Sequence, residues 1–141
     1  MAGAIGISGE FTLQAAGTTT PVAFRLVKID TSGYADYPTA ATDDDVLATV
    51  GFTTDNPGVD ALLPVAGFGN GTRKVTIAAS QTVAIGDLLY CTGTVGCVQN
   101  DTDGWCVGVA REAAVSEASN LAIIEAVVWK PIYIAAATEG V

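Results

Sequence analysis

Short runs of Val, Ile and Thr, interrupted by Gly, Pro, Asn and Asp at intervals of about 8 to 12 residues, restrict the fold of this chain most. Apolar residues at helical spacing are nearly absent. Turn sequences such as Asn56-Pro57-Gly58 and Gly69-Asn70-Gly71 contain Gly and Asn, which adopt positive φ, or Pro, whose ring fixes φ at a negative value. The pattern predicts an all-β protein, either a small β-barrel or a β-sandwich.

Strands are expected wherever an apolar or alternating run lies between two turn signals. Their ranges are 9–15, 21–30, 46–53, 61–66, 73–79, 87–91, 95–99, 105–111, 121–128 and 131–135. The segment 112–119 is expected to form a helical turn or a polar loop. Because Pro131 has no N–H to donate, we expect a strand to end or to lie at a sheet edge there. Ile132, Tyr133 and Ile134 would then be free to reach a neighbouring molecule.

The first 20 residues differ in composition from the rest, since Ala, Gly, Ser and Thr dominate them. We therefore expect an extended N-terminal arm at 1–20 and a single β domain at 21–141, which suits a chain of 141 residues. Two interpretations of the arm are open. It is a frayed terminus, or its apolar residues dock as an added strand on the sheet edge of another subunit. Those residues are Ile5, Ile7, Phe11 and Leu13.

Two segments 57 residues apart look alike. Val50-Gly51-Phe52-Thr53 and Val107-Gly108-Val109-Ala110 each follow an Asp-rich turn and lead into an apolar strand, at 62–65 or at 121–124. The similarity indicates an internal repeat of two half-barrels, at about 22–70 and 73–128. The alternative is a chance similarity between Val-Gly strands, whose residues are common.

Composition and charge exclude several classes of protein. Half of the residues are hydrophobic and only 15% are charged, which excludes a disordered chain and indicates apolar surface buried against other subunits or a larger assembly. Fifteen acidic residues against six basic ones give a net charge of -9, which disfavours nucleic acid and anionic membranes as partners. No apolar run approaches the ~20 residues of a membrane span. No secretory signal is visible, so we expect synthesis in the cytoplasm.

Catalysis, metal binding and cofactor binding are not predicted. The sequence has no histidine, and the spacing of its three cysteines matches no zinc pattern. The acidic stretches 43–45 and 101–103 are expected to be turns, because the calcium-loop spacing is not met. Cys91, Cys97 and Cys106 are expected to be buried free thiols. Pairing of Cys91 with Cys97 across a hairpin is the alternative.

A series of motifs between Val50 and Glu125 follows one order. The motifs are Val50-Gly51-Phe52-Thr53, Leu62-Leu63-Pro64-Val65, Arg73-Lys74-Val75-Thr76-Ile77, Val83-Ala84-Ile85-Gly86-Asp87-Leu88-Leu89-Tyr90, Val95-Gly96-Cys97-Val98, Val107-Gly108-Val109-Ala110 and Leu121-Ala122-Ile123-Ile124-Glu125. In this order and spacing they resemble the capsid decoration, or cement, proteins of tailed bacteriophages. Residues 30–45 and the tail after Trp129 fit the pattern less well.

The resemblance implies a small all-β structural protein, usually trimeric, without catalytic residues or cofactor. It would bind the outer surface of the phage head over junctions between major capsid subunits and clamp the shell against internal DNA pressure. Its partners would be the major capsid protein and further copies of itself. The N-terminal segment commonly contacts the capsid in such proteins. The candidate capsid or inter-subunit contacts are Ile5, Ile7, Phe11, Leu13, Trp129, Ile132, Tyr133 and Ile134.

Other functions remain as alternatives. The segment 83–89 also resembles the V-x-x-G-D-x-L turn of biotinyl and lipoyl carriers, although the following Thr92-Gly93-Thr94 lacks the lysine that a carrier modifies. The second alternative is another kind of small acidic β-barrel that acts as a binding module. A small acidic hydrolase using Asp44 and Asp103 is the third alternative.

Overall fold

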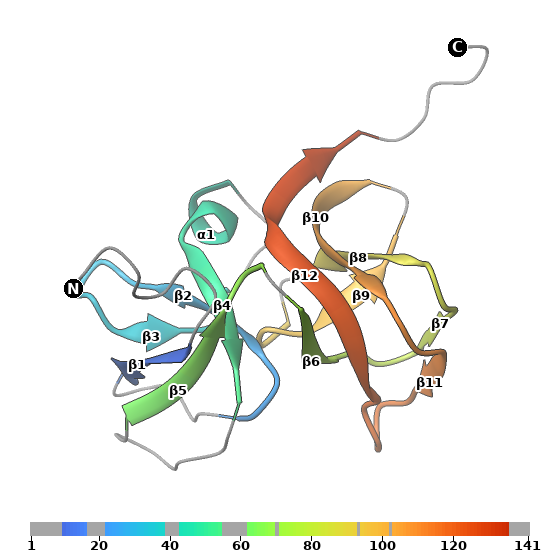
Figure 1. Cartoon of the computed structure of the whole chain (residues 1–141), viewed down its shortest axis with the longest axis horizontal. Helices are drawn as coiled ribbons and strands as arrows, with labels where there is room; N and C mark the ends of the chain where they lie inside the picture. The colour runs from blue at the N-terminus through green and yellow to red at the C-terminus, as the bar shows by residue number, and fades with distance from the viewer. Residues whose placement is uncertain are drawn as a thin grey trace.

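The computed structural model describes residues 10–16, 22–38, 43–54, 62–69, 71–92, 94–101 and 103–135. Within these ranges the regular secondary structure is almost entirely β-strand, so the all-β prediction is confirmed. Figure 1 shows two β lobes side by side, one formed by β1 to β5 and the other by β6 to β12.

The first lobe contains five strands and a short helix. They are β1 (Glu10–Gln14), β2 (Leu26–Ile29), β3 (Ala35–Asp36), α1 (Asp43–Leu47), β4 (Thr49–Thr53) and β5 (Leu62–Gly67). The second lobe contains seven strands. They are β6 (Thr72–Thr76), β7 (Gln81–Val83), β8 (Leu88–Cys91), β9 (Val98–Asn100), β10 (Gly104–Ala110), β11 (Ala114–Ser116) and β12 (Ile123–Ile134).

Each lobe is a closed barrel of five strands. In the first, the order is β1-β5-β4-β2-β3, and a parallel bridge between Ala15 and Ala35 joins the two outer strands. In the second, the order is β6-β12-β10-β8-β9, and a parallel bridge between Ile77 and Val98 closes it. The closing hydrogen bonds correspond as well. Ala16 N donates to Ala35 O at 2.9 Å, and Ala78 N donates to Val98 O at 2.8 Å.

The registers of the two barrels match strand by strand. Gly51 pairs with Gly67 and Val27 in the first barrel, as Gly108 pairs with Val128 and Leu89 in the second. The residue before each glycine, Val50 or Val107, forms a bulge against the neighbouring strand. Two copies of one topology therefore make up the described part of the chain, with β7 and β11 as an added ribbon in the second copy.

The structure corrects the predicted limits of the repeat. Each copy is a closed barrel and not a half-barrel. The first copy includes β1, which lies before the expected start at residue 22, whereas the second reaches Val128, the counterpart of Gly67. Register also aligns Leu62 with Ile123, two residues beyond the expected Leu121.

The N-terminal segment does not form an arm throughout its expected range of 1–20. Residues 10–14 form β1, which pairs along its whole length with β5. Phe11 and Leu13 are partly buried and pack against the interior of the first barrel. Ile5 and Ile7 lie outside the described residues.

Two apolar clusters correspond to the two barrel interiors. The residues at matching positions are Leu13, Ala15, Val27, Ala35, Val50, Leu63 and Val65 in the first barrel and Val75, Ile77, Leu89, Val98, Val107, Ile124 and Ala126 in the second. The second cluster also contains Leu26 and Phe52, which belong to the first barrel. The barrels are therefore packed against each other, because a face of the first one closes onto the core of the second.

Candidate interaction surface

Strand β12 continues beyond the barrel that it closes. Its counterpart β5 ends at Gly67, which corresponds to Val128, so residues 129–134 have no equivalent in the first barrel. We call this segment the β12 extension. It pairs with the start of β10, where Gly104 lies opposite Ile134, Trp105 opposite Tyr133, and Cys106 opposite Ile132. In Figure 1 it rises past the other strands of the second barrel.

Pro131 does not end the strand, contrary to the first part of our expectation. Residues 129–131 lie opposite Val107 alone, where the register of β10 and β12 shifts. Pairing with β6, on the other side of β12, reaches only to Val127 opposite Thr72. Pro131 thus occupies a bulge beyond the last β6 pair, and bulges and edges are the sites where a sheet tolerates proline.

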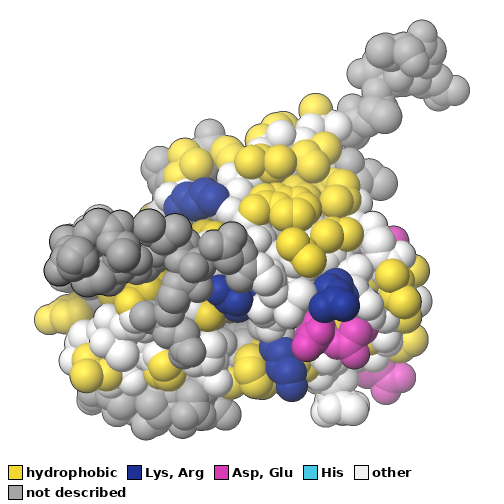
Figure 2. Space-filling model, in the orientation of Figure 1, with side chains coloured by type: hydrophobic (Ala, Val, Ile, Leu, Met, Phe, Trp, Pro, Cys, Tyr) yellow, Lys and Arg dark blue, Asp and Glu magenta, His cyan; other side chains and the backbone are white. Residues whose placement is uncertain are grey.

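The side chains of the β12 extension expose apolar surface. Ile132 is 52% exposed and Tyr133 is 59% exposed, while Ile134 is partly buried. The ring of Tyr133 meets that of Trp105 edge to face, with centroids 5.5 Å apart, and Trp105 packs against the second-barrel core. In Figure 2 hydrophobic side chains gather over the part of the molecule where Figure 1 places the upper half of β12.

Lys130 ties the β12 extension to the first barrel. Its Nζ donates to Leu47 O at 2.8 Å and to Thr49 O, and it lies 5.9 Å from the centroid of the Phe68 ring. Burial lowers the pKa of Lys130. A cation at the carbonyl end of α1 is also electrostatically favourable. The extension is therefore held at both of its sides, by β10 and by α1.

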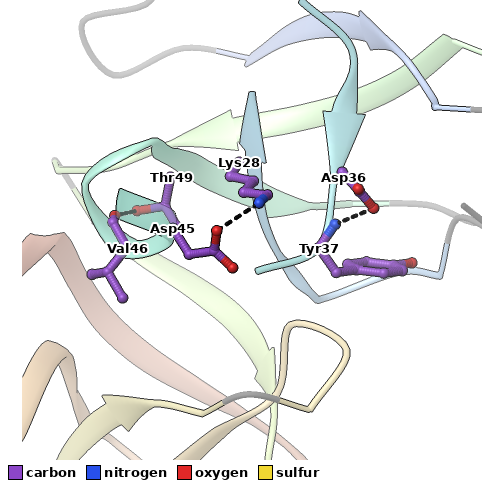
Figure 3. Close-up of polar contacts among 6 residues, drawn as sticks. All are labelled: Lys28, Asp36, Tyr37, Asp45, Val46 and Thr49. Carbon is purple, nitrogen blue, oxygen red and sulfur yellow. Dashed lines mark hydrogen bonds and ion pairs between the residues drawn. The ribbon is translucent and has the colours of Figure 1, made fainter. Parts of the chain in front are cut away.

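Helix α1 is positioned by polar contacts within the first barrel. Lys28 Nζ lies 2.7 Å from Asp45 Oδ1, and Thr49 Oγ1 donates to Val46 O at 2.6 Å (Figure 3). Tyr37 N donates to Asp36 Oδ1 at 2.8 Å on the other side of β2. The acidic stretch expected to be a turn thus begins a helix, whose last residue, Leu47, is 54% exposed beside the Lys130 contact.

All three cysteines are buried and free, as expected, and Cys91 and Cys97 form no disulfide here. Burial raises the pKa of each thiol, and that of Cys91 to about 12. Thiols in this state are poor nucleophiles and poor metal ligands at neutral pH, because both roles require the thiolate. Cys91 packs in the core of the second barrel.

The lysines lie where a carrier would not place its modified residue. Lys28 is in β2, Lys74 in β6 and Lys130 in β12, and each contacts a neighbouring carboxylate, ring or carbonyl. The Gly86-Asp87 turn is closed by Asp87 Oδ2, which accepts from Ala84 N at 2.8 Å. The structure therefore lends no support to the carrier alternative.

In the described ranges, no group of three His, Cys, Asp or Glu side chains is arranged to hold a metal ion. The helix found there is far too short to cross a membrane.

The β12 extension brings together four of the residues expected to make contacts, which are Trp129, Ile132, Tyr133 and Ile134. The indole Nε1 of Trp129 is buried without a hydrogen-bond partner. The contacts expected from the sequence did not include Trp105, Lys130 or Leu47. Trp105 carries a usable signal, since it precedes the Val-Gly bulge by two residues. Lys130 and Leu47 are brought together only by the packing of the two barrels.

Comparisons with known proteins leave the family open. No protein-family model matches the chain, and no curated protein matches it significantly.

Proposed function

We propose that this protein is a structural component of a tailed-bacteriophage head, bound to the outer surface of the capsid as an oligomer, with a trimer as the implied form. In this role it stabilises the shell against the pressure of the packaged DNA. The proposal rests on the motif order described above, and the observation that carries it is the exposed apolar surface of the β12 extension. After synthesis in the host cytoplasm, the protein joins the virion, with the major capsid protein as its partner.

The β12 extension suits a contact surface because closing the barrel does not require it. The first barrel is closed with β5 ending at Gly67, so residues 129–134 are additional. Exposed Ile and Tyr side chains on a rigid ribbon lose little conformational entropy on binding, and aromatic residues often carry much of an interface's energy. When many copies of such a protein bind one shell, the binding energies of their contacts add up and stabilise the shell.

We expect the capsid to contact the side chains of the β12 extension and not to add a strand along the edge of β12. Pro131 removes one backbone donor, and the Lys130 side chain occupies the region between β12 and α1. Proline and lysine are the residues with which natural sheets block edge-to-edge pairing. We therefore assign the capsid contact to the exposed side chains of Ile132 and Tyr133.

Binding to isolated heads tests the proposal. Heads lacking this protein are mixed with the purified wild type or with Ile132→Glu, and the bound fraction is measured by co-sedimentation and by cryo-EM occupancy. A buried charge without a partner costs several kcal/mol, so Ile132→Glu should reduce binding by at least about 10-fold. Val115→Glu is the matched control, because Val115 is 63% exposed on β11, at the opposite end of the second barrel.

Two results would overturn the proposal. One is failure of the wild-type protein to bind the heads. The other is equal binding by wild type, Ile132→Glu and a Tyr133→Glu variant, with circular dichroism showing all three to be folded.

A further inference from the structure

The contact between the two barrels of one chain has an exposed counterpart on the second barrel. In the first barrel, the register places Leu26, Phe52 and Ala66 side by side across β2, β4 and β5. We call these residues the first-barrel row. They are 0%, 1% and 4% exposed, and Leu26 and Phe52 pack into the second-barrel core.

The matching positions of the second barrel are Leu88, Val109 and Val127, which lie side by side across β8, β10 and β12. We call them the second-barrel row. Leu88 is 38% exposed, Val127 is 37% exposed and Val109 is partly buried. The row of apolar residues that is fully covered in the first barrel is thus also apolar in the second barrel, where it is partly exposed.

The surface that covers the first-barrel row also has a counterpart. At the end of the second barrel, Gly96 O accepts a hydrogen bond from Leu26 N at 2.9 Å, and Cys97 is 1% exposed. A Cβ on Gly96 would lie 2.5 Å from Leu26 O, so the first barrel is seated closely against this end. Register with β9 and β3 makes Gly33 and Tyr34 the matching residues of the first barrel.

Among the described residues, that matching end of the first barrel is open. Gly33 has a positive φ like Gly96, but a Cβ placed on it would meet no atom within 4 Å. Tyr34 is 45% exposed where Cys97 is covered, and Ile29 is 40% exposed where its counterpart Cys91 is 4% exposed. Each chain therefore presents both halves of the contact, one on each barrel.

We propose that the second-barrel row of one molecule binds the open end of the first barrel of a second copy, around Ile29, Gly33 and Tyr34. This contact repeats between chains the packing seen within a chain. It is heterologous, because different surfaces meet, and such contacts either close into rings or extend without limit. A closed ring of three chains would contain six similar barrels.

One difference makes the contact between chains weaker than the contact within a chain. Arg25, whose Nη1 donates to Val95 O at 2.9 Å, has Asp87 at its counterpart position. Tethering by the linker between β5 and β6 also favours the intrachain contact. We therefore expect reversible association. The inference goes beyond capsid attachment, since it requires no capsid.

Mixing two variants tests a heterologous contact directly. Leu88→Glu disables the second-barrel row, and Tyr34→Glu disables the open end of the first barrel. In sedimentation velocity, wild type should associate between micromolar and millimolar concentration, and each variant alone should be monomeric. An equimolar mixture should form a one-to-one dimer and nothing larger, because one intact pair of surfaces remains.

The control is Ile123→Glu. Ile123 is 50% exposed on the same strand as Val127, and its counterpart Leu62 is 59% exposed, so neither lies in the intrachain contact. This variant should associate like wild type. Head binding by Ile132→Glu is measured separately, so failure of one proposal does not imply failure of the other.

Several outcomes would refute the inference. They are a wild type that stays monomeric at millimolar concentration, a mixture of Leu88→Glu and Tyr34→Glu that forms no dimer, and a folded Leu88→Glu that associates normally. Loss of head binding by Leu88→Glu with unchanged self-association would instead assign the row to the capsid.

Discussion

Gly51 and Gly108 occupy the same position in the two barrels and meet the same obstacle. A Cβ on Gly51 would lie 2.2 Å from Ala66 O, and a Cβ on Gly108 would lie 2.4 Å from Val127 O. Ala66 and Val127 are themselves matching residues of β5 and β12. The close approach follows the Val50 or Val107 bulge, which brings the bulged strand onto its neighbour.

Alanine at either glycine should therefore destabilise the fold. Since the obstacle is backbone, it cannot move aside as a flexible side chain would, and overpacking of this kind costs about 1–3 kcal/mol. We expect Gly51→Ala and Gly108→Ala each to lower Tm by several degrees, at about 3 °C for each kcal/mol. Differential scanning calorimetry measures this. An unchanged Tm in both variants would show that the strands can separate at no cost.

The turns before β2 and β8 are a second matched pair. Phe24 N donates to Thr53 O at 2.8 Å and Gly86 N donates to Ala110 O at 2.9 Å, and both residues have positive φ, 64° and 90°. A Cβ on Gly86 would meet no atom within 4 Å, so substitution there changes backbone energy alone. Gly86→Ala should cost about 1 kcal/mol and Gly86→Val more, whereas Gly86→Asn should cost least. Urea denaturation of the three variants checks this ranking, and equal losses would contradict it.

The sequence predicts the Val-Gly repeat because a bulge needs a small residue at a fixed place, and that requirement is visible at Gly51 and Gly108. It does not predict β3, β7 or β11, which are only two or three residues long. Their pairing comes from neighbouring strands and not from their own composition. The turn at Gly86 can be predicted from the sequence, because glycine adopts positive φ easily. The matching turn at Phe24 cannot, because a large residue rarely adopts the positive φ that it has there.

The candidate interaction surface also has a part that the sequence predicts and a part that it does not. Exposed apolar side chains near Pro131 can be predicted from the local sequence, because proline in a sheet lies at an edge or a bulge. The contact of Lys130 with Leu47 and Thr49 joins residues more than 80 positions apart and depends on how the barrels pack. The covered row at Leu26 and Phe52 is likewise defined only by that packing.

The Lys28–Asp45 ion pair should stabilise the first barrel more than a surface pair would. The two side chains are 16% and 17% exposed, and the Nζ–Oδ1 distance is 2.7 Å. In a double-mutant cycle of Lys28→Met and Asp45→Asn, we expect a coupling energy of about 1–3 kcal/mol, measured by urea denaturation. The reference cycle is Arg111→Met with Glu125→Gln, whose pair is 3.6 Å apart and 55% and 43% exposed. Its coupling should stay below about 1 kcal/mol. Equal couplings would contradict the role given to burial.

Removal of N-terminal residues should have a sharp limit at Glu10. Deletion of residues 1–9 leaves β1 intact, and the first barrel should keep its stability. Deletion of residues 1–16 also removes β1 and the closing hydrogen bond from Ala16 N to Ala35 O, which exposes the apolar interior around Leu63 and Val65. We expect this second variant to lose cooperative unfolding of the first barrel, detected by hydrogen exchange of β4 and β5. Equal exchange in the two variants would show that β1 does not close the barrel.

The buried thiols should make the protein sensitive to high pH. Cys91 is 4% exposed and its pKa is raised to about 12 from an ordinary value of 9.0, because burial penalises the thiolate. The neutral thiol is favoured in the folded state, so its contribution to stability is complete below pH 9 and is lost as the pH rises toward 12. At pH 10 the loss from this group is roughly 1 kcal/mol. Urea denaturation at pH 8 and pH 10 should therefore show a smaller decrease in the free energy of unfolding for Cys91→Ala than for wild type.

A thiol reagent at pH 8 should modify the cysteines of the folded protein slowly, and should modify all three at once in urea. An equal pH dependence in wild type and Cys91→Ala, together with rapid labelling of the folded chain, would show that the thiols are accessible.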